Sequence, residues 1–242
     1  MNTLIKNALI TGASRGIGKS IAHAMAQEGY NLILVCHNNI DILESYAKAL
    51  TDEFGVQCRC YGGDIGSEVF CEEIFSDITS LDVLVNNAGI SHIGLLQDMS
   101  AIEWNSIINT NLTSAFYTCR KAIPIMVSQK CGNIINISSM WGRVGASMEV
   151  AYSASKGGLN AMTQALAKEL APSNISVNAI ACGVIDTDMN SHLSEEDKEC
   201  LKNEIPADRF ATPDEVATAV LSIIKAGPYM TGQIIGFDGG FI

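Results

Sequence analysis

Long apolar runs are missing from this 242-residue sequence, and positive charge is scarce. No run reaches the roughly 20 residues that cross a bilayer, and no basic-then-apolar leader opens the chain. We therefore expect no membrane anchor and a cytoplasmic location. The formal net charge is −11, which argues against binding to nucleic acid or to an anionic membrane surface.

Paired cysteine motifs are missing as well. The eight cysteines form no C-x-x-C pair, and the four histidines do not cluster with them. We therefore predict neither a metal site nor a disulfide framework. Reduced cysteines that help to fill a core are the simpler interpretation.

Linkers, internal repeats and low-complexity tracts are also absent. The composition is 48% hydrophobic and 17% charged, which allows a substantial core. The sequence therefore predicts a single domain over residues 1–242.

What the sequence does contain is an alternation of short apolar runs and longer amphipathic stretches. Residues 3–11 are too short for a membrane span or a leader, and we interpret them as the region of the first strand. Apolar runs predict strands at 8–11, 32–36, 81–86, 134–138 and 175–180, with weaker candidates at 56–61 and 233–237. Amphipathic patterns predict helices at 17–28, 40–54, 68–78, 101–128 and 151–170. This alternation is typical of an α/β fold, a Rossmann-type doubly wound parallel sheet of about seven strands with helices on both faces.

One irregular stretch, residues 183–212, is polar and charged. A long segment at the strand ends of such a sheet is a candidate substrate-binding lid.

A glycine-rich loop follows the first strand and opens the first helix. Gly12, Gly16 and Gly18 are spaced Gly-x-x-x-Gly-x-Gly. Glycines let the backbone turn tightly and approach a pyrophosphate, and the helix N-terminus offers unpaired N–H groups. The loop therefore predicts a dinucleotide site, although a turn needed only for packing would look similar.

The end of the second strand bears on the choice of cofactor. An acidic residue there would bind a ribose 2′-hydroxyl, but the chain has Cys36, His37 and Asn38. Arg15 stands in the loop, where its guanidinium could meet a phosphate. We therefore favour NADPH, with NADH possible.

Tyr152 and Lys156 lie four residues apart within a predicted helix. Residues at i and i+4 share a helix face. At roughly 5 Å and an effective dielectric near 20, the ammonium would favour the phenolate by about 3 kcal/mol. We therefore expect the tyrosine pKa to fall from about 10 toward the operating pH, which suits a general acid. The spacing alone would also fit a solvated helix face.

These motifs together resemble the short-chain dehydrogenase/reductase family over residues 8–240. The matching motifs are the glycine loop, the Asn86-Asn87-Ala88-Gly89 strand end and the positions of Asn111, Ser139, Tyr152 and Lys156. The resemblance implies cofactor contacts at Gly12, Ser14, Arg15, Gly16, Ile17, Gly18, His37, Asp64, Ile65, Asn87, Ala88, Gly89, Tyr152, Lys156, Gly183, Ile185 and Thr187.

The resemblance also implies roles for the four catalytic positions. Tyr152 would protonate a carbonyl oxygen while nicotinamide gives hydride to the carbon. Lys156 would hold the ribose, Ser139 would orient the carbonyl, and Asn111 would anchor a water. Ser138 is the alternative to Ser139, and it could simply cap the strand end.

The chain departs from the family pattern after the sixth strand. The usual Pro-Gly pair is Cys182-Gly183 here, and loss of proline loosens the backbone. We expect the cofactor contacts implied for Ile185 and Thr187 to survive, with a more mobile lid.

Within the family, the chain looks most like the 3-oxoacyl-[acyl-carrier-protein] reductases. The implied partner is then an acidic carrier protein, which needs cations. Lys130 stands at one expected basic position, whereas Ser173 stands where an arginine is common.

A second possibility comes from the stretch between Ser139 and Tyr152, which helps to wall the substrate pocket. Here it resembles the reductases of the 5-aminopentanone modification on elongation factor P. Trp141 and Glu149 could suit an amine-bearing ketone, or they could be a packed and a solvated residue. A cofactor sensor without catalysis is a third possibility, disfavoured by the four filled catalytic positions. The family-typical oligomer is a homotetramer, with a homodimer as the alternative.

Overall fold

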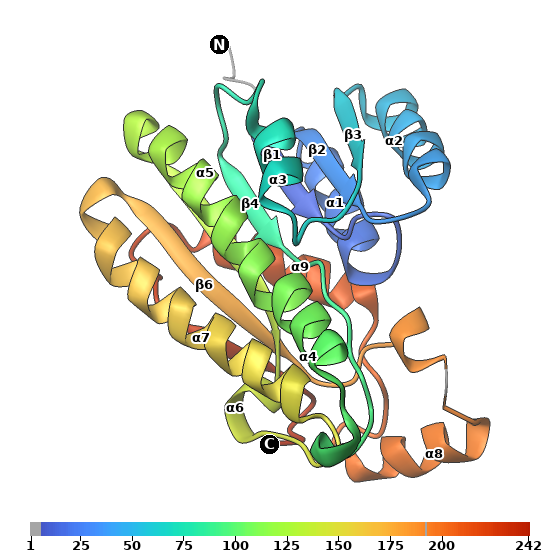
Figure 1. The fold of residues 1–242 in the computed structure, drawn as a ribbon. Coiled ribbons are helices and arrows are strands. Elements are labelled where there is room, and N and C mark those ends of the chain that lie inside the picture. Colours follow the sequence, from blue (N-terminus) through green and yellow to red (C-terminus); the bar gives the residue numbers. More distant parts are fainter. Residues whose placement is uncertain (1–5, 192) are drawn as a thin grey trace.

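Seven parallel strands form one sheet in the order β3-β2-β1-β4-β5-β6-β7 (Figure 1). A computed structural model describes residues 6–191 and 193–242. The strands are β1 (Asn7–Thr11), β2 (Asn31–Cys36), β3 (Cys58–Gly62), β4 (Val83–Asn86), β5 (Gly132–Ser139), β6 (Ile175–Cys182) and β7 (Ile234–Phe237). The chain order reverses between β1 and β4, as in a doubly wound sheet. The predicted Rossmann-type architecture is confirmed.

Helices cover both faces of the sheet, and each face has its own apolar core. One core joins the sheet to α1, α2 and α9, and the other joins it to α3, α5 and α7. The helices are α1 (Gly16–Gln27), α2 (Ile40–Phe54), α3 (Glu68–Phe75), α4 (Ala101–Ile108), α5 (Ser114–Gln129), α6 (Trp141–Val144), α7 (Val150–Leu170), α8 (Glu195–Glu204) and α9 (Pro213–Lys225). Short helical turns lie at Leu96–Asp98, Asn109–Thr113, Ala171–Ser173 and Asp188–Asn190.

The central strands are continuous apolar runs because both of their faces are covered. All eight residues of β6 are buried, and β5 is buried except at Asn133. These two strands pair over their full length, from Gly132 opposite Ile175 to Ser139 opposite Cys182. They end at the same level, so the residues that follow them meet at one edge of the sheet.

Three predicted elements differ from the structure. The predicted helix over 101–128 is two helices joined by a π turn at Asn109–Thr113. The stretch 183–212 contains a regular helix, α8, which begins at a capping box of Ser194 and Asp197. The predicted strand over 3–11 begins at Asn7, and residues 3–5 of that prediction lie outside the described residues.

The predicted functional residues lie mostly on the loops and helices that follow the carboxyl ends of the strands. Figure 1 shows α6, α8 and the start of α4 gathered at the lower end of the sheet, where β4, β5 and β6 terminate. In an open parallel sheet the ligand binds outside these ends, near the point where the strand order reverses. Among the described residues, no helix is both long and apolar enough to span a bilayer.

Candidate active site

The glycine loop after β1 is held in place by the strand end that follows β4. The Asn87 side chain donates to the carbonyls of Thr11 (2.9 Å) and Gly12 (3.1 Å). The Thr11 hydroxyl in turn accepts from the backbone N–H groups of Asn87 and Ala88, each at 3.0 Å. The two loops therefore form one rigid floor, and Thr11 is a supporting residue that the sequence did not reveal.

The glycines of this loop are required by space and by conformation. Gly12 has φ of +67°, and a Cβ there would lie 2.9 Å from the Asn87 amide nitrogen. A Cβ at Gly18 would collide with the Gly12 carbonyl oxygen. The loop therefore brings its backbone close to the open N-terminus of α1, which is the geometry that holds a pyrophosphate.

Arg15 precedes α1 and reaches across to the predicted lid. Its guanidinium lies 3.7 Å from the Asp188 carboxylate, and both side chains are at least 70% exposed. An exposed pair of this kind contributes at most about 1 kcal/mol. A phosphate group could therefore compete with Asp188 for Arg15. Gly16 also contacts the lid, because a Cβ there would lie 3.3 Å from the Thr187 methyl group.

The neighbouring strand ends lie where the adenosine half of a dinucleotide would bind. Cys36 is buried at the end of β2, and His37 after it is exposed. Asp64 follows β3 and accepts a hydrogen bond from the N–H of Gly66 (2.8 Å). Ile65 is 5% exposed and belongs to the core beneath.

Tyr152, Ser139 and Lys156 meet at the carboxyl edge of the sheet. The Ser139 side chain lies close enough to Tyr152 to lower the pKa of the tyrosine. Lys156 is 4% exposed, and its ammonium nitrogen lies 5.7 Å from the centre of the Tyr152 ring. The helical i, i+4 spacing therefore does bring the phenol and the ammonium to the same place.

The electrostatics of this pair differ from the expectation. Burial raises the pKa of Tyr152, and the Ser139 side chain lowers it only in part. Burial also lowers the pKa of Lys156 from its ordinary 10.5 to about 8. The predicted lowering of the tyrosine pKa by Lys156 is therefore wrong for this structure. The reason is that the ammonium donates to the Ile137 carbonyl (2.8 Å) in a site where burial opposes charge on both groups.

The two candidate serines have different surroundings. Ser138 donates weakly to the Lys156 carbonyl (3.4 Å), which is a packing contact. The Ser139 oxygen accepts from the Trp141 N–H (3.2 Å), and Ser139 is the serine that lowers the Tyr152 pKa. The geometry therefore favours Ser139 over Ser138.

Asn111 lies in the π turn, and its side chain makes three hydrogen bonds. It donates to the Ile90 carbonyl (2.9 Å) and to Ser155 (3.0 Å), and it accepts from the Ile90 N–H (2.8 Å). A Cβ at Gly89 would lie 3.4 Å from both the Asn111 amide oxygen and the Lys156 ammonium. Asn111 therefore anchors the loop after β4 beside Lys156, and π turns of this kind are frequent at functional sites.

The segment after β6 lies against β7 and against the lid. The N–H of Gly183 donates to the Phe237 carbonyl (2.9 Å). Ile185 pairs with Ala211, and its carbonyl accepts from the Asn190 side chain (2.8 Å). Thr187 therefore follows a fixed segment, close to the glycine loop.

Comparison with known proteins agrees with this geometry. Residues 6–198 match the short chain dehydrogenase family. The chain is 40% identical over 242 residues to the 3-oxoacyl-[acyl-carrier-protein] reductase FabG of Staphylococcus aureus (strain Mu50 / ATCC 700699). This match covers 98% of each chain.

This chain belongs to the short-chain dehydrogenase family. It is therefore an NAD(P)-dependent oxidoreductase. It is also 39% identical to an uncharacterized oxidoreductase, YmfI of Bacillus subtilis (strain 168), over 98% of each chain. A solved structure, a putative gluconate dehydrogenase from Agrobacterium tumefaciens, superposes with a TM-score of 0.92 at 33% identity. That match covers 98% of this chain and 95% of the other.

In this short-chain dehydrogenase, the two predicted wall residues Trp141 and Glu149 have different surroundings. Trp141 begins α6, and its ring packs edge-on against Phe241 at 5.9 Å between centroids. Glu149 precedes α7, and its charge contributes to raising the pKa of Tyr152. The carboxylate therefore acts on the tyrosine hydroxyl, whereas the indole is shared with the end of the chain.

Exposed apolar side chains form a rim on the segments next to Asn111 and Tyr152. Its members are exposed by 39% to 53% and come from the segment after β4 and from the start of α7 with the residues before it: Ile90, Ile93, Leu95, Leu96, Met148 and Val150. The two segments are joined by a hydrogen bond from the Gly94 N–H to the Met148 carbonyl (2.8 Å). No periodic pattern in the sequence marks this rim, because most of its members lie outside regular helices and strands.

Among residues 6–191 and 193–242, no cluster of three or more potential ligands could hold a metal ion.

Proposed function

We propose that this oxidoreductase is an NADPH-dependent reductase that converts a ketone to a secondary alcohol, and that its substrate is a 3-oxoacyl thioester on an acyl carrier protein. The observation that carries the proposal is that Ser139, Tyr152 and the buried Lys156 meet at one strand edge. A phenol, a hydroxyl and an ammonium at one strand edge suit proton transfer to a carbonyl oxygen.

The glycine floor fits a dinucleotide. The close approach of Gly12, Gly18 and Asn87 leaves no room for a Cβ, and the N-terminus of α1 opens above it. A bound nicotinamide would supply the hydride. Gly89 would lie beside the ring side of the cofactor, because a Cβ there would be only 3.4 Å from the Lys156 ammonium.

In the proposed reaction, Tyr152 donates its proton to the ketone oxygen. Ser139 holds that oxygen through a second hydrogen bond and keeps the phenol in place. Lys156 has a pKa of about 8, so it can bind a ribose hydroxyl and return a proton to the tyrosine near neutral pH. Asn111 fixes the loop that encloses the lysine and would anchor the water that connects it to solvent.

Two features support NADPH rather than NADH. No carboxylate follows β2, where Cys36 and His37 stand. Arg15 is exposed and is held only by an exposed pair with Asp188 at 3.7 Å. A 2′-phosphate would form charge-assisted hydrogen bonds with Arg15, which are stronger than that pair.

The apolar rim supports an acyl substrate. Ile93, Leu95 and Met148 expose about half of their surface on this rim, and an acyl chain would cover it. Lys130, at an expected basic position, and Ser173, which replaces the common arginine, lie just before β5 and β6, at their amino ends. A carrier could therefore touch them only if a second copy of the chain places them beside the site, which agrees with a proposed homotetramer or homodimer. We retain the cytoplasm as the proposed location.

Glu149 favours a second candidate, reduction of the 5-aminopentanone group on elongation factor P. Its carboxylate lies close enough to Tyr152 to affect the tyrosine pKa, so it could receive the ammonium of an amine-bearing ketone. The Trp141 ring could add a cation–π contact.

The decisive experiment compares two ketones and two cofactors. Oxidation of NADPH or NADH is followed by absorbance with acetoacetyl carrier protein and with ketone-bearing elongation factor P. We expect turnover of the carrier substrate and a preference for NADPH of about tenfold. Turnover of only the elongation-factor substrate, with a selective loss in Glu149→Gln, would establish the second candidate instead. Consumption of neither ketone would leave the cofactor-sensing alternative.

Ser139→Ala and Ser138→Ala form a matched pair. Ser139→Ala should lower kcat by roughly 100-fold, because it removes the group that holds the carbonyl oxygen and Tyr152. Ser138→Ala should keep kcat within about threefold, because it loses only a long 3.4 Å contact. Steady-state kinetics at saturating NADPH measure both, and equal losses would contradict the assignment of Ser139.

A further inference from the structure

A tight turn follows β7 and sends the chain back toward the active site. We call residues 238–242 the strap. The Asp238 side chain accepts a hydrogen bond from the Gly240 N–H (3.0 Å), and its carbonyl accepts from the Phe241 N–H (3.3 Å). Gly239 and Gly240 have φ of +67° and +86°, a conformation that other residues rarely adopt. The turn is therefore built for this reversal.

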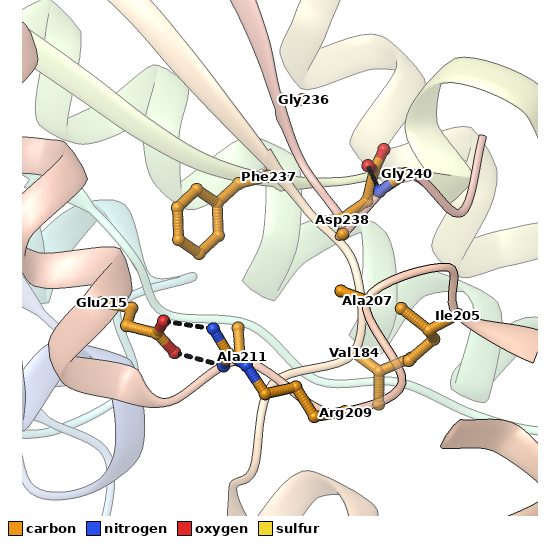
Figure 2. A pocket seen from close by; sticks show the side chains of 11 residues that line it. Val184, Ile205, Ala207, Arg209, Ala211, Glu215, Gly236, Phe237, Asp238 and Gly240 are labelled. Atoms are coloured by element: carbon orange, nitrogen blue, oxygen red, sulfur yellow. Dashed lines mark hydrogen bonds and ion pairs between the residues drawn. The ribbon is translucent and has the colours of Figure 1, made fainter. Parts of the chain in front are cut away.

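One side of the strap touches the predicted lid. A Cβ at Gly239 would lie 2.9 Å from Ile205 and 3.0 Å from Ala207, and Gly240 lies against Pro206. Figure 2 shows Ile205 and Ala207 beside the strap, around a cavity of about 410 Å³ that is also lined by Arg209 and Glu215. The strap is thus packed on the chain that leaves α8.

The other side of the strap touches α6, which follows Ser139. The Phe241 ring packs edge-on against Trp141, 5.9 Å away and at an angle of 83°. The Asp238 carboxylate lies 3.8 Å from the Arg143 guanidinium, and its side chain is only 10% exposed. The carboxylate oxygen that faces Arg143 has no hydrogen-bond partner among the described residues, so Arg143 is the cation that balances it.

The strap also contacts Gly183, which is one of the predicted cofactor residues. A Cβ at Gly183 would lie 2.7 Å from the Cα of Asp238. Gly183 follows β6 and bonds to Phe237. One short segment therefore contacts the lid, the α6 wall and the segment after β6.

We propose that the strap positions the lid relative to the α6 wall, and that Asp238, Arg143 and Phe241 are positioning residues for the ketone. Only the kinetic part of this inference rests on the proposed function. Loosening the strap would leave the glycine floor intact, so the ketone should lose affinity while NADPH does not.

Trypsin tests the strap without any assumption about the reaction. Lys198 and Lys202 lie on α8, and cleavage there reports how often the lid opens. In Phe241→Ala and Asp238→Asn, cleavage of the full chain at α8 should rise by about five- to tenfold. Ile242→Ala is the matched control, since Ile242 is 40% exposed, and it should behave like the wild type.

Kinetics then test the consequence. The KM for the ketone should rise about three- to tenfold in either variant, with the Kd for NADPH within about twofold. Arg143→Gln should match Asp238→Asn, and the double variant should be no worse than either single, because the two residues act as one pair. Compared with Phe241→Ala, Phe241→Leu should recover much of the lost affinity for the ketone. That recovery would show that the chain still folds when residue 241 is changed.

Wild-type cleavage in both variants, or equal acceleration in Ile242→Ala, would overturn the inference. An increase in the Kd for NADPH as large as that in KM would also overturn it. If the wild-type chain reduces no ketone, the proposed function fails, and the trypsin result still decides whether the strap holds the lid.

Discussion

Tyr152→Phe is expected to lower kcat by about 10²- to 10⁴-fold, the usual contribution of a positioned general acid. The change removes only the hydroxyl that lies beside Ser139. The ring should keep its place beside Lys156, so the Kd for NADPH should stay within about twofold. Stopped-flow absorbance gives the rate, and nicotinamide fluorescence gives the binding constant.

Tyr117→Phe is the control for this prediction. Tyr117 lies on α5, where its ring packs 5.4 Å from Phe116. Loss of its hydroxyl should leave kcat unchanged, since Tyr117 packs against the apolar core shared by α3, α5 and α7. A Tyr152→Phe enzyme that turns over at the wild-type rate would remove the general acid from the mechanism and would redirect attention to Ser139.

Local patterns predicted the parts of the molecule in which one segment determines its own structure. The seven apolar runs became the seven strands, with ends shifted by at most two residues. The glycine spacing marked a loop whose close contacts leave no space for a Cβ at Gly12 or Gly18. The i, i+4 pair of Tyr152 and Lys156 depended only on helix geometry, and the structure places both at the strand edge.

The π turn shows where local patterns fail. Apolar spacing predicted one helix through 101–128, but the turn at Asn109–Thr113 interrupts it. Asn111 stabilises this turn through Ile90 and Ser155, which are 21 and 44 residues away in sequence. A helix propensity cannot report a bond to a distant loop, so the break was not visible in the sequence.

Two helices were missed although the sequence carried a signal. The capping boxes Ser194–Asp197 and Thr212–Glu215 mark the starts of α8 and α9, but α8 lies in a charged stretch that suggested a loop. The four-residue α6 carries no such box and is too short to show any periodicity.

The tyrosine pKa was mispredicted for a different reason. The sequence argument weighed one attractive charge at an effective dielectric near 20. The structure adds burial of both groups, and burial is the largest influence on each pKa. How deeply a side chain is buried depends on the tertiary structure, and it could not be predicted from the spacing of two residues in the sequence.

That burial leads to the second large prediction, which concerns stability. Lowering the Lys156 pKa from 10.5 to about 8 means that the charged form is disfavoured by roughly 3 kcal/mol in the folded state. Lys156→Met removes this cost but leaves the Ile137 carbonyl without its donor, a loss of about 1 kcal/mol. We therefore expect Lys156→Met to unfold with a free energy about 2 kcal/mol larger at pH 7, while kcat falls by at least about 10²-fold.

The pH dependence provides the sharper test. The folded protein releases the Lys156 proton near pH 8, whereas the unfolded chain keeps it until about pH 10.5. The wild type should therefore gain stability as pH rises from 8 toward 10.5, and the advantage of Lys156→Met should shrink over the same range. Urea unfolding at pH 7 and at pH 10 measures this difference.

Lys168→Met provides the matched control, because Lys168 is an exposed residue of the same helix. Its effect on stability should stay within about 0.5 kcal/mol at both pH values. If Lys156→Met increases stability and lowers kcat as expected, the lysine is retained for its chemistry. Natural proteins keep such destabilising residues where function requires them. If Lys156→Met is destabilised at pH 7 by as much as a core deletion, the lysine is a structural element, and its proposed part in the proton transfer falls.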